Sequence, residues 1–195
     1  MYVYLCKRIC NWGDLSMVDF TVEQFISCIE KGEDITGLNL SDLDLSNLSL
    51  RKLNLRGANL TRCRLSNTDL SGTDLTRANL TEATLSKAKL CGTILVRANL
   101  SRANARKADL RSANFESANL SGAASNSGQS TARVIGADLH MVNAQNTNFH
   151  NANLVRVNFN SSNLIGANFR GANITRMSLQ GAKYDVDAFD HSISV

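Results

Sequence analysis

The chain has 195 residues, a net charge of +4, no proline and only 6% aromatic residues. This length predicts one domain with small additions, and no apolar run approaches the ~20 residues that a membrane-spanning helix needs. The five cysteines do not form a small-domain disulfide framework, which favours a reducing compartment and predicts a cytoplasmic location.

Residues 1–20 carry few structural signals. The opening residues MYVYLCKRIC place apolar side chains before Lys7 and Arg8, which is the reverse of a secretory signal. Residues 2–5 are compatible with an edge strand. Cys6 and Cys10 lie one helical turn apart, but no further cysteine or histidine pair completes a zinc site, so they are interpreted as incidental thiols.

Residues 21–32 (TVEQFISCIEKG) predict a short amphipathic helix. Thr21 and Gln24 have the spacing of a capping box, and Gly32 is a stop signal. One stripe of this helix is apolar and consists of Val22, Phe25, Ile26 and Ile29. Residues 1–36 are therefore predicted to be an N-terminal segment whose helix caps the structure that follows.

From residue 37 onward the chain repeats every five residues. Fifteen of the 17 positions taken in steps of five from Leu40 to Leu120 are leucine, and the exceptions are Ala105 and Phe115. The residue two places earlier is small or apolar, and the residue between is usually Asn or Asp. Because positions two apart point to the same side of an extended chain, both apolar residues can face inward while the remaining two residues turn the chain.

This pattern resembles the pentapeptide-repeat family, A(D/N)LXX, over roughly three quarters of the chain. Units such as GANL (57–60), RANL (77–80), KADL (107–110) and NANL (151–154) carry the resemblance. It implies an all-β solenoid, a right-handed quadrilateral β-helix with four units per coil and about seven coils over residues 37–184. Residues 20 apart then stack, which predicts an asparagine ladder, Asn39 to Asn119, and an ion-pair column of Asp42, Arg62, Glu82 and Arg102.

The repeat is interrupted once, at residues 121–133 (SGAASNSGQSTAR), and resumes one residue short at Leu139. This small, polar segment predicts a surface loop. It is either a tolerated insertion or a partner-binding loop, since loops on rigid scaffolds often carry function. In the second case the candidate contact residues are Ser125, Asn126, Gln129 and Arg133.

Residues 185–195 predict a cap or a tail. Val186, Phe189 and Ile193 can cover the last coil, or they can pair two chains end to end. The chain is accordingly expected to be a monomer or a C-terminal end-to-end homodimer.

The sequence offers no convergent set of catalytic, metal-binding or cofactor-binding residues. Of the three histidines, His140 and His150 lie two units apart and so on opposite sides of a four-sided coil, while His191 is in the tail. Ser and Asp are abundant because the repeat requires small polar residues. We therefore expect a protein that is not an enzyme.

Charge differs between regions. Residues 37–184 contain 18 Lys and Arg against 8 Asp and Glu, whereas both ends are acidic. If the loop replaces about one side of a coil, Arg77, Arg97, Arg156 and Arg176 fall in one column, a basic stripe suited to an acidic protein, nucleic acid or membrane surface. The alternative is that these arginines are ordinary solvated residues.

We therefore expect a non-catalytic scaffold that presents a basic, rod-shaped surface to a protein partner. Quinolone-resistance members of the family are understood to mimic DNA and occupy DNA gyrase, which requires negative charge along the rod, so a basic rod disfavours this function. A third possibility is a targeting module of a secreted bacterial effector, because similar repeats occur in injected proteins.

Overall fold

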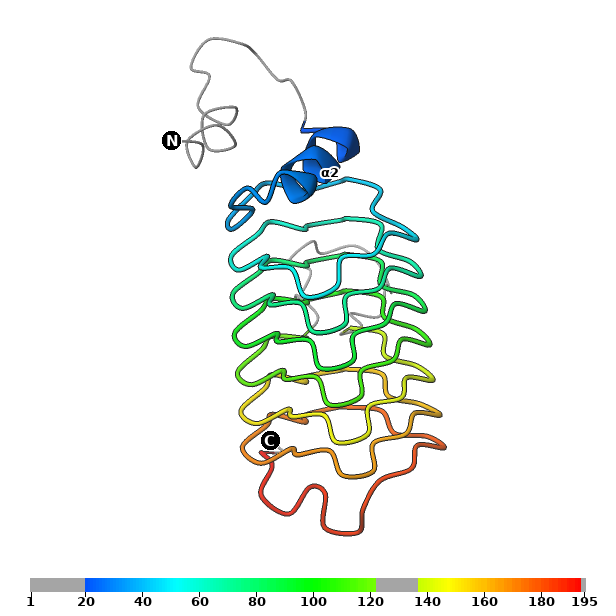
Figure 1. The fold of residues 1–195 in the computed structure, drawn as a ribbon. Helices are drawn as coiled ribbons and strands as arrows, with labels where there is room; N and C mark the ends of the chain where they lie inside the picture. The colour runs from blue at the N-terminus through cyan, green and yellow to red at the C-terminus, as the bar shows by residue number, and fades with distance from the viewer. Residues whose placement is uncertain (1–19, 122–136, 194–195) are drawn as a thin grey trace, which may run out of the picture.

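The computed structural model describes residues 20–121 and 137–193. One helix, α2 (Val22–Glu30), lies at the end of a stack of coils that leads to the C-terminus (Figure 1). The predictions for residues 2–5 and for Cys6 and Cys10 lie outside the described residues.

Helix α2 begins where the capping motif predicts. The Thr21 hydroxyl accepts a hydrogen bond from the Gln24 backbone N–H, and the Gln24 side chain accepts one from the Thr21 backbone N–H. Gly32, with φ of 65°, follows the last turn. The buried residues of α2 are Phe25 and Cys28, and the half-buried Val22 and Ile29 pack against the core, whereas the half-buried Ile26 is not among the residues packed there. The predicted stripe was therefore wrong at Ile26, because Cys28 takes the buried position instead.

The coils are held together by isolated parallel β-bridges, and no extended strand forms among the described residues. Before the interruption each bridge joins residues 20 apart, such as Asn39 and Asn59, and a new bridge follows every five residues. Four bridges fit into each such interval, so the coil has four sides. Two of every five residues are needed to turn the corner, so each side is too short for a longer ladder.

The corners are four-residue turns. In one of them the Ala58 N–H donates to the Leu55 carbonyl at 3.1 Å, and Gly57 has φ of 67°. Such a turn requires positive φ at its third residue, a conformation that favours glycine. Many corners nevertheless hold Lys, Arg, Ser or Asn at this position, including Arg77 with φ of 60°.

The interior is a continuous apolar core. The large residue of each unit is almost completely buried from Leu40 to Phe169, and the small residue beside it is usually alanine. On one side of the last coils, phenylalanines replace leucine. The Phe115 and Phe149 rings stack with centroids 5.2 Å apart, and those of Phe149 and Phe169 with centroids 5.1 Å apart.

The interruption of the repeat does not remove a side of the coil. Asn104 pairs with Asp138 and Asn119 pairs with Asn153. The first side after the interruption therefore stacks where the next side would stack in an uninterrupted coil. The spacing between paired residues is 34 residues there, as for Asn114 and Asn148, instead of the 20 residues found for Asn39 and Asn59.

The prediction that the loop replaces about one side of a coil is therefore wrong. The described residues on either side of the interruption pair as in uninterrupted coils, so the hydrogen-bonded register continues across it with no side missing. The predicted contact residues Ser125, Asn126, Gln129 and Arg133 lie outside the described residues.

The two predicted columns are present. The Asn59 Nδ2 donates to Asn39 Oδ1 at 2.8 Å, although Asn99 Nδ2 donates to Thr81 Oγ1 and so interrupts the amide ladder. The ion-pair column is confirmed by two contacts of 2.7 Å, between Arg62 and Asp42 and between Arg102 and Glu82.

Candidate interaction surface

The four arginines of the predicted stripe do not share a column. Arg77 and Arg97 occupy the corner that precedes the Asn79 and Asn99 bridges, whereas Arg156 and Arg176 follow the Asn153 and Asn173 bridges. The shift arises because the loop is an addition between complete coils and does not replace a side. The single stripe was therefore a wrong prediction. The four arginines instead lie on the two edges of the same side of the rod.

Most arginines elsewhere in the repeat region form ion pairs. Arg51 contacts Asp69 at 3.1 Å and Arg56 contacts Asp74 at 3.0 Å, each with a separation of 18 in the chain. The other pairs are Arg62 with Asp42, Arg64 with Asp44, Arg102 with Glu82, Arg106 with Asp138, and Arg111 with Asp109. The Arg51 and Arg56 pairs were missed because sequence reasoning considered only the vertical columns and not diagonal contacts between them.

The ion pairs also affect the acidity of their carboxyl groups. The Arg62 guanidinium holds the pKa of Asp42 below its usual value by donating hydrogen bonds to both of its oxygens, at 2.7 and 2.8 Å. Asp42 therefore stays ionised on this exposed surface, and the pair remains intact under ordinary conditions.

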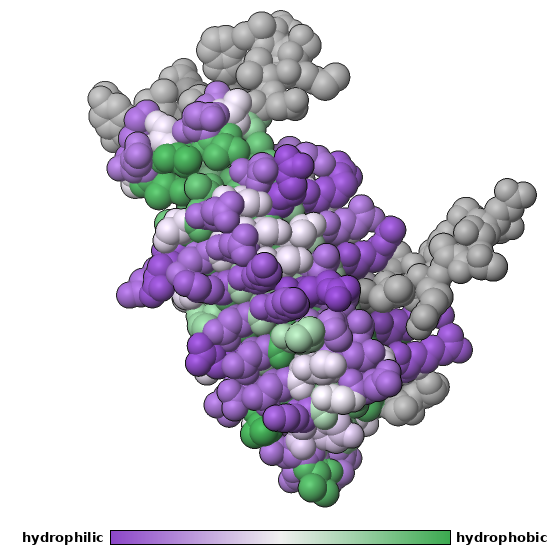
Figure 2. Space-filling view, turned by 90° about the vertical axis from the view of Figure 1, so that its right-hand side faces the viewer, coloured by the Kyte–Doolittle hydropathy of each residue, from purple (hydrophilic) through white to green (hydrophobic). Residues whose placement is uncertain are grey.

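The four arginines of the predicted stripe are among the unpaired cations of the described surface. Within residues 20–121 and 137–193, no carboxylate lies within ion-pair distance of Arg77, Arg97, Arg156 or Arg176. Arg156 is half-buried and the other three side chains are exposed. Figure 2 shows that one flank of the rod is predominantly hydrophilic, with apolar groups gathered near α2 and at the opposite tip.

The C-terminal residues divide into two groups. Phe189 is partly buried against the core, and its ring centroid lies 4.8 Å from that of Phe169, so it continues the phenylalanine column as a cap. Val186 is fully exposed and Ile193 is half exposed. The Ile193 N–H donates to the Ala172 carbonyl, which adds one more bridge beyond Asn173.

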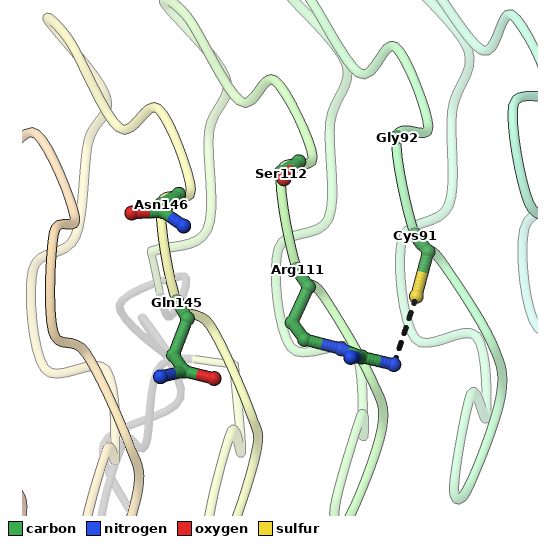
Figure 3. A pocket seen from close by; sticks show the side chains of 6 residues that line it. All are labelled: Cys91, Gly92, Arg111, Ser112, Gln145 and Asn146. Carbon is green, nitrogen blue, oxygen red and sulfur yellow. Dashed lines mark hydrogen bonds between the residues drawn. The ribbon is translucent and has the colours of Figure 1, made fainter.

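A shallow, open hollow of about 520 Å³ lies on another side of the rod. Its lining comes from three successive coils and consists of Cys91, Gly92, Arg111, Ser112, Gln145 and Asn146 (Figure 3). The Arg111 side chain points toward the Cys91 sulfur, and their nearest atoms are 3.9 Å apart.

This hollow contains no activated nucleophile. Burial, together with the neighbouring Asp109, raises the pKa of the Cys91 thiol, so the reactive thiolate is disfavoured. Arg111 donates to both oxygens of Asp109, at 2.9 and 2.7 Å, so its charge is already neutralised. The hydrogen bonds from Arg111 also hold the pKa of Asp109 below its usual value.

The histidines of the repeat do not converge. His140 follows the Asp138 bridge and His150 follows the Asn148 bridge, and these bridges belong to opposite sides of the coil. The His150 Nδ1 lies 2.8 Å from the Arg170 carbonyl oxygen. Over the described ranges, no three His, Cys, Asp or Glu residues are arranged to hold a metal ion.

Comparison with known families identifies the repeat. The family model for pentapeptide repeats matches in eight copies, at residues 34–67, 58–95, 93–124, 135–176 and 152–183. The chain belongs to the pentapeptide repeat family. Proteins of this family form quadrilateral β-helices, in agreement with the four-sided coil described above. No curated protein matches the sequence significantly.

Several solved pentapeptide repeat proteins are similar to the chain. HetL from the cyanobacterium Nostoc sp. strain PCC 7120, involved in heterocyst differentiation regulation, is 25% identical, with 90% of this chain and 98% of HetL covered and a TM-score of 0.32. Rfr23 from the cyanobacterium Cyanothece 51142 is 21% identical, with 87% and 97% covered and a TM-score of 0.40.

A further similar structure is that of QnrB1, a plasmid-mediated fluoroquinolone resistance protein. It is 20% identical to the chain, with 88% of this chain and 86% of QnrB1 covered and a TM-score of 0.38. In the part of the chain that the structure describes, no helix is long and apolar enough to cross a membrane.

Proposed function

We propose that the protein is a non-catalytic scaffold whose rigid repeat domain binds another protein. The observation that carries this proposal is the C-terminal end of the stack. Tyr184, Val186 and Ile193 are exposed apolar side chains gathered at this end. In the described residues, the backbone N–H groups of Leu179 and Tyr184 donate none of the backbone hydrogen bonds that join neighbouring coils elsewhere.

An open edge with exposed apolar side chains favours pairing with another chain. The partner is either a second copy, which makes an end-to-end dimer, or a different protein that covers the same end. The proposed cytoplasmic location is compatible with either. The proposed right-handed coil of about seven turns is supported by the bridge column from Asn39 to Ile193, which makes seven steps.

Light scattering on the purified full chain tests this proposal. We expect a dimer mass for the native protein and a monomer mass for the variant Val186→Asp, because the substitution places a charge in the contact. Lys183→Gln is the control, since it changes an exposed side chain of the same coil without altering the apolar contact. The proposal is contradicted if the native protein is a monomer and a cross-linker attached at the C-terminal end of the stack captures no partner.

A second candidate function is protection of DNA gyrase by DNA mimicry, suggested by the similarity to QnrB1. Charge argues against it. Every carboxylate in the described repeat residues except Glu116 is engaged by an arginine, so the rod does not present a row of free negative charges. We expect no effect in a gyrase supercoiling assay with or without a fluoroquinolone. Protection of gyrase by the protein would favour mimicry instead.

A further inference from the structure

One side of the rod carries arginines on both of its edges. This side is called here the arginine-edged face, and Asn59, Asn79, Asn99, Asn119, Asn153 and Asn173 form its central bridge column. At the positive-φ position of the corners, Arg77 and Arg97 lie on one edge, and Arg62, Arg102, Arg156 and Arg176 lie on the other. The bridge column makes five steps between coils from Asn59 to Asn173, a length of roughly 24 Å at the usual spacing of β-strands.

Four of these six corner arginines carry free charge. Arg62 and Arg102 are paired with Asp42 and Glu82, whereas the other four have no carboxylate partner among the described residues. Arginine is a strong ligand for phosphate, because its planar guanidinium donates several hydrogen bonds in a fixed geometry. The face therefore presents four unneutralised phosphate-binding groups along the rod, against one unpaired carboxylate among its described residues, that of Glu116 in the corner preceding Asn119.

These four arginines occupy backbone positions that favour other residues. Their φ values lie between 56° and 61°, in the left-handed region, and glycine occupies the equivalent corner of the same face at Gly57 and Gly171. A non-glycine residue in this conformation costs roughly 1 kcal/mol. Corners on the other sides of the rod share this conformation, so it does not mark the face by itself. It does mean that glycine or asparagine can replace these arginines without added backbone strain.

The surface between the edges consists of small polar side chains. The Asn column is flanked by hydroxyls, for example Thr61, whose Oγ1 donates to Asn59 Oδ1 at 2.6 Å. None of the large exposed apolar residues of the described chain lies on this face between Arg62 and Arg102. Protein–protein contacts are usually centred on aromatic or apolar anchors, and this described stretch of the face between Arg62 and Arg102 has none that is exposed. A phosphodiester backbone needs only cations and small hydrogen-bonding groups.

We propose that the arginine-edged face binds the phosphate backbone of a nucleic-acid duplex, without reading its sequence. A duplex is favoured over a single strand, because the described part of the face has no exposed aromatic side chains on which unpaired bases can stack. B-form DNA carries one charge per ~1.7 Å of axis, so a face roughly 24 Å long spans about 14 phosphates, or about seven base pairs. This surface adjoins the C-terminal end to which protein binding is assigned above, because Ile193 pairs with Asn173, but none of its four free arginines belongs to the apolar group at that end.

The experiment compares two variants that remove the same charge. The test variant replaces the four free arginines of the face with asparagine (Arg77→Asn, Arg97→Asn, Arg156→Asn and Arg176→Asn). Asparagine tolerates positive φ better than arginine, so this variant is expected to fold at least as stably as the native protein. The control variant removes four cations from other sides: Lys52→Asn, Lys87→Asn, Lys107→Asn and Lys183→Gln. Both changes lower the net charge from +4 to zero.

Binding is measured by fluorescence anisotropy with labelled duplex DNA, and in parallel with duplex RNA, over a series of salt concentrations. With four phosphate contacts on DNA, the logarithm of affinity should fall against the logarithm of salt concentration with a slope of about −3.6. We expect the test variant to lose at least tenfold in affinity and most of this slope. The control variant should stay within about threefold of the native protein. The two arms show whether DNA or RNA is preferred.

Three results would overturn the proposal. The first is no binding of either duplex by the native protein at low salt. The second is an equal loss of affinity in the two variants, which would mean that net charge alone attracts the duplex. The third is competition by polyglutamate as strong as competition by unlabelled duplex, with the same dependence on the four arginines, which would identify an acidic protein as the partner. Thermal melting of each variant confirms that the fold is retained.

Discussion

At the residue scale, the small inward position of each unit tolerates more than alanine. Thr68, Thr73 and Thr93 occupy it, are fully buried, and donate their hydroxyl hydrogens to carbonyls of the preceding coil. Cys63 does the same, with its sulfur 2.7 Å from the Leu40 carbonyl oxygen. Among the described residues, no buried side-chain polar atom lacks a partner, so these substitutions do not leave the unsatisfied groups that destabilise a core.

The buried thiol of Cys63 makes stability depend on alkaline pH. Burial raises its pKa from 9.0 to about 12, so between these values the unfolded chain releases a proton that the folded chain retains. A group whose pKa is raised on folding stabilises the fold below its unfolded pKa, and this contribution is lost as pH rises toward 12. The free energy of unfolding should fall by up to about 1.4 kcal/mol per pH unit in this window.

Urea unfolding of native protein and Cys63→Ala at several alkaline pH values measures this effect. Alanine is present at the equivalent position in the next coil (Ala83), so the variant is expected to fold. The difference in pH dependence between the two proteins isolates the thiol from other titrating groups. Identical slopes for both would show that Cys63 is accessible to water.

Corner residues test the cost of the left-handed conformation. Lys107 is exposed, has φ of 60°, and has no ion-pair partner in the described part of the chain. Lys107→Asn is expected to raise the free energy of unfolding by about 0.5–1 kcal/mol, because asparagine tolerates positive φ. Lys107→Val should lower it by about 1–2 kcal/mol, because a β-branched residue is strained there. Chemical denaturation of both variants measures this, and equal effects of the same sign would contradict the argument.

At the element scale, α2 closes the N-terminal end of the core. Its boundaries followed from the sequence, because the Thr21 and Gln24 capping signals act over one turn of helix. Its buried face did not follow completely. Phe25 was predicted to face the core, but Cys28 is buried where Ile26 was expected. The direction from which a helix meets the coil decides this, and local periodicity does not contain that information.

The capping box of α2 contributes measurable stability. Thr21→Ala removes the side-chain acceptor for the Gln24 N–H, which should cost about 1 kcal/mol. Thr21→Ser keeps a hydroxyl at this position and is expected to cost much less. Hydrogen exchange of the α2 amides should report the loss before global unfolding does. Equal protection in the two variants would mean that packing of Phe25, rather than the cap, holds the helix.

At the scale of the whole molecule, the stack behaves as a series of coils that each contact only their neighbours. The bridges that join Asn104 to Asp138 and Asn119 to Asn153 maintain the register across the insertion. Each side therefore finds its partner in the next coil, even though the inserted segment intervenes in the chain. This explains how a polar segment is accommodated without disturbing the core.

Deletion of residues 124–131 should consequently leave the stack intact. The deletion removes more than half of the insertion, which reduces the entropy cost of closing it by about 0.8 kcal/mol. In a protein of this size, that corresponds to a rise of roughly 2–3 °C in the melting temperature. Circular dichroism should show an unchanged spectrum and a melting curve shifted slightly upward. A large fall in melting temperature would show that the deleted residues stabilise the coils.

The five-residue repeat determined the inward residues, because they depend only on spacings within one unit, which are visible in the chain. The resemblance to the pentapeptide-repeat family implied the four-sided coil. With four units per coil, the asparagine column and the Arg62–Asp42 and Arg102–Glu82 pairs followed from residues 20 apart. The structure decided what the interruption did to the register. Because the bridges between coils pair residues 34 apart across the interruption, with no side missing, the four free arginines lie on the two edges of one face and not in one column. The five-residue period could not predict this change of column, because it results from pairing between segments that the interruption separates in the chain.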